Sequence, residues 1–345
     1  MRPRSTNRRP NAVMRVPLLL AAPVIGLTVL FSQQTGVVDF TAFYASGLEW
    51  RRSGEFYDPP DGVFPNLNLP HTAVLLVPLS WLPYGVSLAL WQALNLACFF
   101  DIGRRLRFSA WVWIGAFVWI PTWLHMGQGQ IGGVVAWLVV RAYLSPSGWW
   151  LGAAMVVKPF LGLFTVAAII RREWGRLVRY SVVGLAAVSL GMAIAGLSSY
   201  REWVTLTRSH ERHEIGLWYH NLSIWFWEAR TEIPAWPVAA ALCVVSGWAL
   251  WRRADPWRLC LPLALLLSPV GWQYYGWILA PLTVGATWLS WTGLILVGLP
   301  QPVLPLGTAG LVILWGRACR DGLRSPPAAI PPLAERSPPP AAESR

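Results

Sequence analysis

Long apolar segments alternate with short polar segments along most of the chain. The first apolar run, Val16 to Ser32, follows an arginine-rich start that contains no acidic residue. Further apolar runs continue to Trp315, and several approach the length of about 20 residues that a helix needs to cross a bilayer. The pattern therefore predicts an all-α polytopic membrane protein with about 10 to 12 transmembrane segments.

Prolines and charged residues mark the ends of the predicted segments. Lys158-Pro159 interrupts the apolar run 149–170. Because proline cannot continue a helix, we expect two half-helices here, the alternative being one broken span. Residues 71–83 form an apolar stretch that is too short to span alone. The other expected spans are 84–102, 108–124, 131–144, 180–197 and 236–251, with about three or four more between 259 and 315.

Charge is distributed unevenly between the polar segments. Ten of the sixteen acidic residues fall in two larger loops, about 33–83 and 198–235, whereas short arginine clusters follow other spans. The positive-inside rule then predicts cytoplasmic N- and C-termini and places both loops on the outer face of the plasma membrane. The expected parts are a basic N-terminus (1–15), a transmembrane catalytic domain (16–316) and a disordered cytoplasmic tail rich in proline and alanine (317–345).

Composition excludes several other protein classes. Of the 345 residues, 55% are hydrophobic and 13% are charged, against about 25% charged residues in soluble domains. The net charge of +12 does not indicate nucleic acid, because the arginines are dispersed between apolar runs. The four cysteines are widely spaced and have no histidine partners, so neither a metal site nor a disulfide framework is expected.

Two ionisable residues are the first candidates for chemistry. Asp39 follows the first predicted span, and a partly desolvated carboxylate there suits a general base. The alternative is a helix N-cap for the run from Phe40 to Arg51. Lys158 is the single lysine beside 27 arginines and lies inside an apolar segment, where a charge indicates function. Its alternative is a lysine whose side chain extends toward the membrane surface.

Three polar segments interrupt the apolar helices. They are 125–130, 218–223 and 268–275. Each is compatible with a simple turn flanked by interfacial aromatic residues. Together they would place hydrogen-bonding groups at one membrane face, where a cavity could form.

Short motifs recur in a fixed order between about Val16 and Trp315. They are Asp39-Phe40-Thr41-Ala42-Phe43-Tyr44, Gly54-Glu55-Phe56-Tyr57-Asp58, Leu69-Pro70, Leu90-Trp91 with Asn95, Gly127-Gln128, Lys158-Pro159, Asn221-Leu222-Ser223 and Leu267-Ser268-Pro269. In this order they resemble glycosyltransferase family 87, membrane transferases of the GT-C fold that use polyprenol-phosphate sugars.

The resemblance implies a fold, a reaction and a set of site residues. It implies a GT-C-type bundle that moves a sugar, expected to be mannose, from polyprenyl phosphate to a hydroxyl of a lipid or glycan acceptor. Transfer would occur at the outer face with inversion, without a metal or other cofactor and without nucleic acid. By the resemblance, Asp39 is the general base, and Lys158, Tyr274 and Tyr275 contact the donor phosphate. The cavity would also include Tyr44, Asp58, Gln128, His220, Asn221 and Ser223.

One position departs from the family pattern. Where members often carry Trp-x-His-His, this chain reads Trp272-Gln273-Tyr274-Tyr275. Tyrosine does not supply a cationic imidazole, so His220 or His125 is a hypothetical substitute. The alternatives to an active transferase are a flippase or transporter for lipid-linked sugars and an inactive family member. The heavy use of arginine over lysine suggests an actinobacterial origin.

Overall fold

The computed structural model describes residues 38–58, 63–145, 147–209, 221–269, 271–299 and 306–324. These ranges are built from helices, together with an isolated antiparallel bridge between Asn221 and Trp272. The predicted N-terminus and first span, 1–32, lie outside the described residues.

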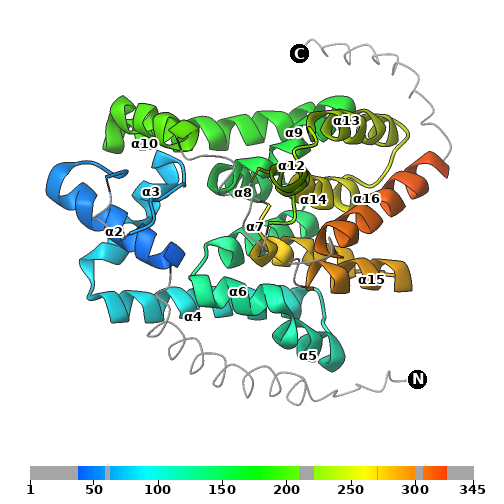
Figure 1. Cartoon of the computed structure of the whole chain (residues 1–345), viewed down its shortest axis with the longest axis horizontal. Coiled ribbons are helices and arrows are strands. Elements are labelled where there is room, and N and C mark those ends of the chain that lie inside the picture. The colour runs from blue at the N-terminus through cyan, green and yellow to red at the C-terminus, as the bar shows by residue number, and fades with distance from the viewer. Residues whose placement is uncertain are drawn as a thin grey trace, which may run out of the picture.

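The helices vary widely in length (Figure 1). In the described residues three segments are 3₁₀ helices. They are α2 (Val38–Ser53), α3 (Pro70–Leu76), η1 (Val77–Trp81), α4 (Tyr84–Arg105), α5 (Ala110–Val118), α6 (Ile120–Gln128), α7 (Gly132–Leu144), α8 (Trp149–Val157), η2 (Pro159–Gly162), α9 (Leu163–Ile170), α10 (Trp174–Ser209), α12 (Ile224–Thr231), α13 (Trp236–Trp251), α14 (Pro256–Leu267), η3 (Gln273–Thr283), α15 (Trp288–Val297) and α16 (Leu306–Arg324).

For the described residues the all-helical prediction is confirmed, and so is the break at Lys158-Pro159. Helix α8 ends at Val157, Lys158 has an extended backbone, and η2 begins at Pro159. Among the described helices, α4 and the segment Trp174–Thr207 of α10 are long and apolar enough to cross a membrane. Several others, including α7, α13 and α14, are apolar but shorter.

Two predicted boundaries were wrong, and a third lies at a kink. The single span predicted over 108–124 is divided at Trp119, whose backbone is extended, because Pro121 lacks the N–H that would continue α5 into α6. The predicted start of the second loop at residue 198 coincides with a kink in α10 at Gly196, whose φ is 75°. The loop 198–235 is itself partly helical, since the second part of α10 continues to Ser209 and α12 follows. Residues 317–324, assigned to the tail, belong to helix α16, while 325–345 lie outside the described residues.

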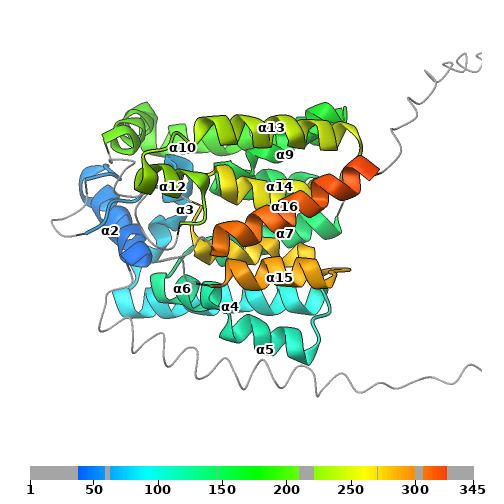
Figure 2. The ribbon, with the colours of Figure 1, turned by 45° about the vertical axis from the view of Figure 1, so that its right-hand side comes forward.

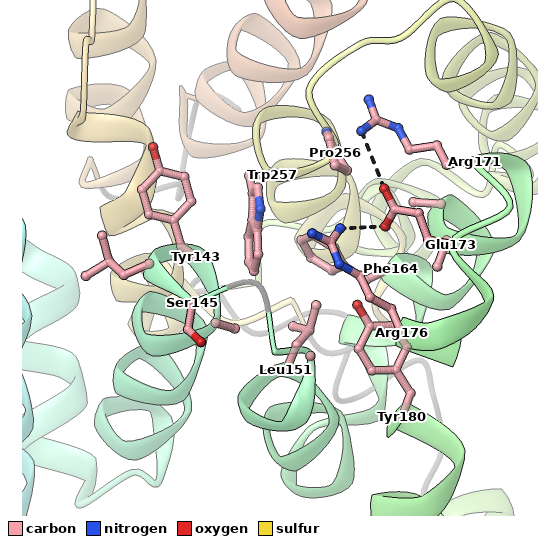
Figure 3. A pocket seen from close by; sticks show the side chains of 15 residues that line it. Tyr143, Ser145, Leu151, Phe164, Arg171, Glu173, Arg176, Tyr180, Pro256 and Trp257 are labelled. Carbon is pink, nitrogen blue, oxygen red and sulfur yellow. Dashed lines mark hydrogen bonds and ion pairs between the residues drawn. The ribbon is translucent and has the colours of Figure 1, made fainter. Parts of the chain in front are cut away.

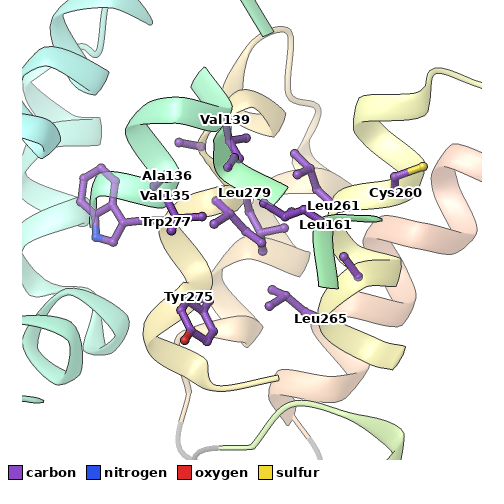
Figure 4. Packing of buried hydrophobic residues seen from close by; sticks show 14 of the residues in the cluster. Val135, Ala136, Val139, Leu161, Cys260, Leu261, Leu265, Tyr275, Trp277 and Leu279 are labelled. Carbon is purple, nitrogen blue, oxygen red and sulfur yellow. The ribbon is translucent and has the colours of Figure 1, made fainter. Parts of the chain in front are cut away.

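Helix α7 lies at the centre of the packing. It contacts α4, α8 and η3, and η3 in turn contacts α6, α14 and α15. Val135, Ala136 and Val139 of α7 have no exposed surface, and Leu279 of η3 is likewise fully buried (Figure 4). This core fixes the ends of α7 and η3, which carry polar residues.

The bundle has two chemically different ends. Helices α2 and α3 lie at one end, which we call the site end; in Figure 2 they are at the left. The opposite end, which we call the basic end, carries Arg105, Arg252 and Arg324 at the C-terminal ends or caps of α4, α13 and α16. Helix α8 runs from the basic end to Lys158, and η2 with α9 runs back to Arg171, so Lys158 lies at the tip of a helical hairpin.

Large apolar side chains cover the outside of the bundle. Trp111 is 81% exposed, Trp288 77% and Val244 72%. So much exposed apolar surface on several helices is typical of a chain surrounded by lipid rather than by water.

Candidate active site

A cavity of about 120 Å³ lies at the site end of the bundle. Five separate parts of the chain form it: the start of α2, the loop before α3, the end of α6 with its following turn, the tip of the α8–α9 hairpin, and the start of η3 with the residue before it. Its lining comprises Asp39, Ala42, Phe43, Phe64, Pro65, Asn66, Leu67, Asn68, Leu124, Gln128, Gln130, Lys158, Trp272, Tyr274 and Tyr275.

Asp39 is the acidic residue of this lining. It lies in the first turn of α2, one residue inside the helix rather than at the N-cap, and its side chain forms a hydrogen bond with Gln130. The residue as a whole is partly exposed, whereas its carboxyl group is closely surrounded by protein. This burial raises the pKa of Asp39 to about 6, although the hydrogen bond from Gln130 and the charge of Lys158 oppose the shift.

Lys158 points into the cavity from the tip of its hairpin. Its Nζ donates a hydrogen bond to Asn68 Oδ1 at 2.9 Å and lies 5.3 Å from the centre of the Tyr275 ring. Asn68 is itself fixed, because its backbone N–H and its Nδ2 both donate to Asn66 Oδ1, at 3.0 and 2.8 Å. These contacts exclude the alternative of a lysine that extends toward the membrane surface.

The aromatic side of the cavity replaces the histidine pair of the family pattern. Tyr274 forms a hydrogen bond with Gln130, its ring stacks on Trp272 at 5.8 Å, and it meets Tyr275 edge-on at 4.9 Å. The backbone N–H of Leu222 donates to Gly271 O at 2.8 Å, which holds this segment beside the second loop. The tyrosines therefore lie beside both Asp39 and Lys158.

The other predicted site residues have different positions. Gln128 lines the cavity as predicted. Asn221 is fully buried, and its Nδ2 donates to Pro269 O at 3.0 Å. Its Oδ1 accepts from the backbone N–H of Ser223 at 3.1 Å. Asn221 therefore holds the neighbouring backbone in place and does not line the cavity itself. Tyr44 donates to Leu82 O, and Asp58 is exposed; neither lies in the lining. His220 lies outside the described residues.

His125 does not take the place of the missing histidine pair. Its side chain is fully buried behind Gly132 and Gly133, and its Nε2 lies 3.0 Å from Asn95 Oδ1 in a hydrogen bond. His125 is absent from the lining of the cavity. Among the described residues of that lining, Lys158 carries the cationic side chain. The hypothesis that His125 contacts the donor is therefore wrong.

Two polar residues of the site, Asn66 and Asn68, were missed from the sequence, and Gln130 was predicted only as part of the polar segment 125–130. Asn66 Nδ2 and Gln130 Oε1 are buried without a hydrogen-bond partner in the described part of the chain. Such groups favour a ligand with hydroxyl or phosphate oxygens, because buried polar atoms are normally paired. The two asparagines between Pro65 and Pro70 were the available signal in the sequence.

Comparison with known proteins now assigns the family. The family model of glycosyltransferase family 87 matches residues 67–271. The chain belongs to glycosyltransferase family 87. Within the matched range lie Asn68, Gln130 and Lys158, whereas Asp39 precedes it and Tyr274 follows it.

Two curated relatives extend the similarity to most of this family 87 member. Both are named polyprenol-phosphate-mannose-dependent alpha-(1-2)-phosphatidylinositol pentamannoside mannosyltransferase. The protein from Mycobacterium tuberculosis is 24% identical over 85% of this chain and 79% of its own length. The protein from Mycolicibacterium smegmatis is 24% identical over 82% and 81%. Both come from actinobacteria, in agreement with the composition. No solved structure matches.

Proposed function

We propose that this family 87 enzyme is a multi-pass membrane mannosyltransferase. It moves mannose from polyprenyl phosphate to a hydroxyl of a lipid or glycan acceptor at the outer face of the plasma membrane. The names of the two relatives support the donor and a lipid acceptor. The observation that carries the proposal is one cavity holding a carboxylate and a lysine, Asp39 and Lys158, within a glycosyltransferase family.

The proposed reaction is a single displacement. The acceptor hydroxyl gives its proton to the Asp39 carboxylate while its oxygen attacks the anomeric carbon of the donor. The bond from that carbon to the phosphate oxygen breaks on the opposite face, so the configuration is inverted. Polyprenyl phosphate leaves with the electron pair, and the Lys158 ammonium, oriented by Asn68, stabilises its growing charge. Neither a metal nor another cofactor takes part in the proposed step.

The pKa of Asp39 suits this role. A carboxylate with a pKa of about 6 is ionised at neutral pH, yet it accepts a proton more readily than an exposed carboxylate does. Family 87 glycosyltransferases are membrane proteins, and exposed apolar helices surround this core. Arg105, Arg252 and Arg324 lie at the end opposite the cavity, which supports a GT-C-type bundle with cytoplasmic termini and an outer-face site.

Reconstituted enzyme tests the proposal directly. The assay supplies radiolabelled polyprenyl phosphate mannose and an acceptor lipid fraction, and it measures both mannosyl product and donor translocation. Asp39→Asn abolishes product formation, whereas Asp58→Asn, which changes an exposed acid outside the cavity, retains it. Full activity of Asp39→Asn would refute the mechanism. Donor translocation by the wild type without product would instead favour the flippase alternative.

A further inference from the structure

A second cavity, of about 200 Å³, lies at the basic end of the bundle. Helices α7 and α8 connect it to the first cavity, because each has one end beside each cavity. The 13 residues of α7 place the two cavities about 20 Å apart along the bundle. The second cavity therefore serves a purpose other than holding the reacting groups.

Two arginines and one glutamate form the charged side of this cavity (Figure 3). Both Arg171 and Arg176 pair with Glu173, Arg171 Nη1 at 4.0 Å from its carboxylate. One carboxylate thus faces two guanidinium groups. The Nε of Arg171 is buried and has no hydrogen-bond partner among the described residues. The Arg176 side chain is 37% exposed, so the positive charge is accessible from outside.

Aromatic and aliphatic side chains form another wall of the cavity. Trp257 packs on Phe164 with ring centres 4.8 Å apart and meets Tyr143 edge-on at 5.6 Å. Leu151 and the chain around Ala167 complete this wall. The cavity therefore combines an accessible cationic edge with a wall of aromatic and aliphatic side chains.

This combination matches one class of ligand. Arginine forks bind phosphate oxygens through paired hydrogen bonds. Basic pockets between transmembrane helices attract anionic lipids from the adjoining leaflet. The aromatic wall fits the glycerol backbone and first methylenes of a lipid, which inorganic phosphate lacks. We propose that this cavity binds the phosphate headgroup of an anionic phospholipid at the basic end of the bundle. The proposal is independent of the sugar-transfer reaction.

Binding to the full chain in detergent tests this inference. Native mass spectrometry measures the affinity for short-chain phosphatidylglycerol, with phosphatidylcholine and inorganic phosphate as comparison ligands. Arg176→Gln weakens binding of phosphatidylglycerol about fivefold, the factor that one arginine near an anionic surface contributes. Arg104→Gln is the matched control, because Arg104 also forms an i,i+3 pair, with Asp101, outside the cavity lining.

A second variant distinguishes a ligand site from a structural role. Glu173→Gln removes the carboxylate that competes for both arginines, so it strengthens binding of phosphatidylglycerol, an effect that poor folding does not produce. Unchanged affinity in both cavity variants would overturn the proposal. Equal weakening by Arg104→Gln, or equally tight binding of phosphatidylcholine or inorganic phosphate, would also overturn it. Mannosyl transfer is not measured, so these outcomes leave the proposed function untouched.

Discussion

The pH dependence of sugar transfer reports directly on the environment of Asp39. With its pKa raised to about 6, the carboxylate is ionised above pH 6 and progressively protonated below it. A general base works in its ionised form, so kcat/KM rises with pH and levels off above about pH 7. At pH 5 about one tenth of the enzyme carries the ionised base, against more than about nine tenths for an unperturbed aspartate.

Removing the hydrogen bond from Gln130 sharpens this test. Gln130→Met keeps the volume of the side chain and deletes a hydrogen bond to a charged group, worth about 1.5 kcal/mol or more. Since 1.36 kcal/mol corresponds to one pKa unit, the midpoint of the acid limb moves from about pH 6 to about pH 7. The assay is the pH profile of kcat/KM for both enzymes with saturating acceptor. A wild-type midpoint near pH 4, or the same midpoint in both enzymes, would refute the reasoning.

Three further predictions concern stability and donor binding. The pKa of Asp39 is higher in the folded than in the unfolded protein, so burial of the ionised carboxylate costs about 3 kcal/mol at neutral pH. Asp39→Asn therefore raises the thermal stability at pH 7. The gain disappears below about pH 4, where the carboxyl group is protonated in both states. Lys158→Gln raises the donor Kd about tenfold or more, and Asn68→Ala raises it less, as titration with polyprenyl phosphate measures. Gly310→Ala lowers the melting temperature, since a Cβ there would lie 2.5 Å from Gly293 O, whereas Gly316→Ala, with open space around it, does not.

Many helix boundaries could be predicted from the residue types at the helix ends. Prolines and arginines mark many helix ends, and the lone lysine identified the tip of the α8–α9 hairpin. The break at Trp119 was missed because the run around it is largely apolar, and periodicity alone does not divide such a run. Pro121 was the available signal, as Pro159 was for the break at Lys158. The end of α16 was placed too early because its arginines resembled a boundary. The Arg317–Asp321 pair instead lies one turn apart within the helix.

The site was only partly readable, because it is assembled from distant parts of the chain. Asp39 and Lys158 were unusual enough to be identified individually. Gln130 resembled a turn residue, and its bonds to Asp39 and Tyr274 depend on how three segments meet. His125 shows the reverse error, since its polar segment suggested a cavity while its partner is Asn95, buried within α4. Neither relation follows from spacing along the sequence.

A single-turnover experiment tests the central claim most directly. Donor is first bound to reconstituted enzyme, acceptor is added in excess, and mannosyl product is followed in the wild type, in Asp39→Asn and in Asp58→Asn. Asp39→Asn is expected to bind the donor with nearly wild-type affinity but to form no product, while Asp58→Asn forms product at the wild-type rate. Product formation by Asp39→Asn at that same rate would contradict the account.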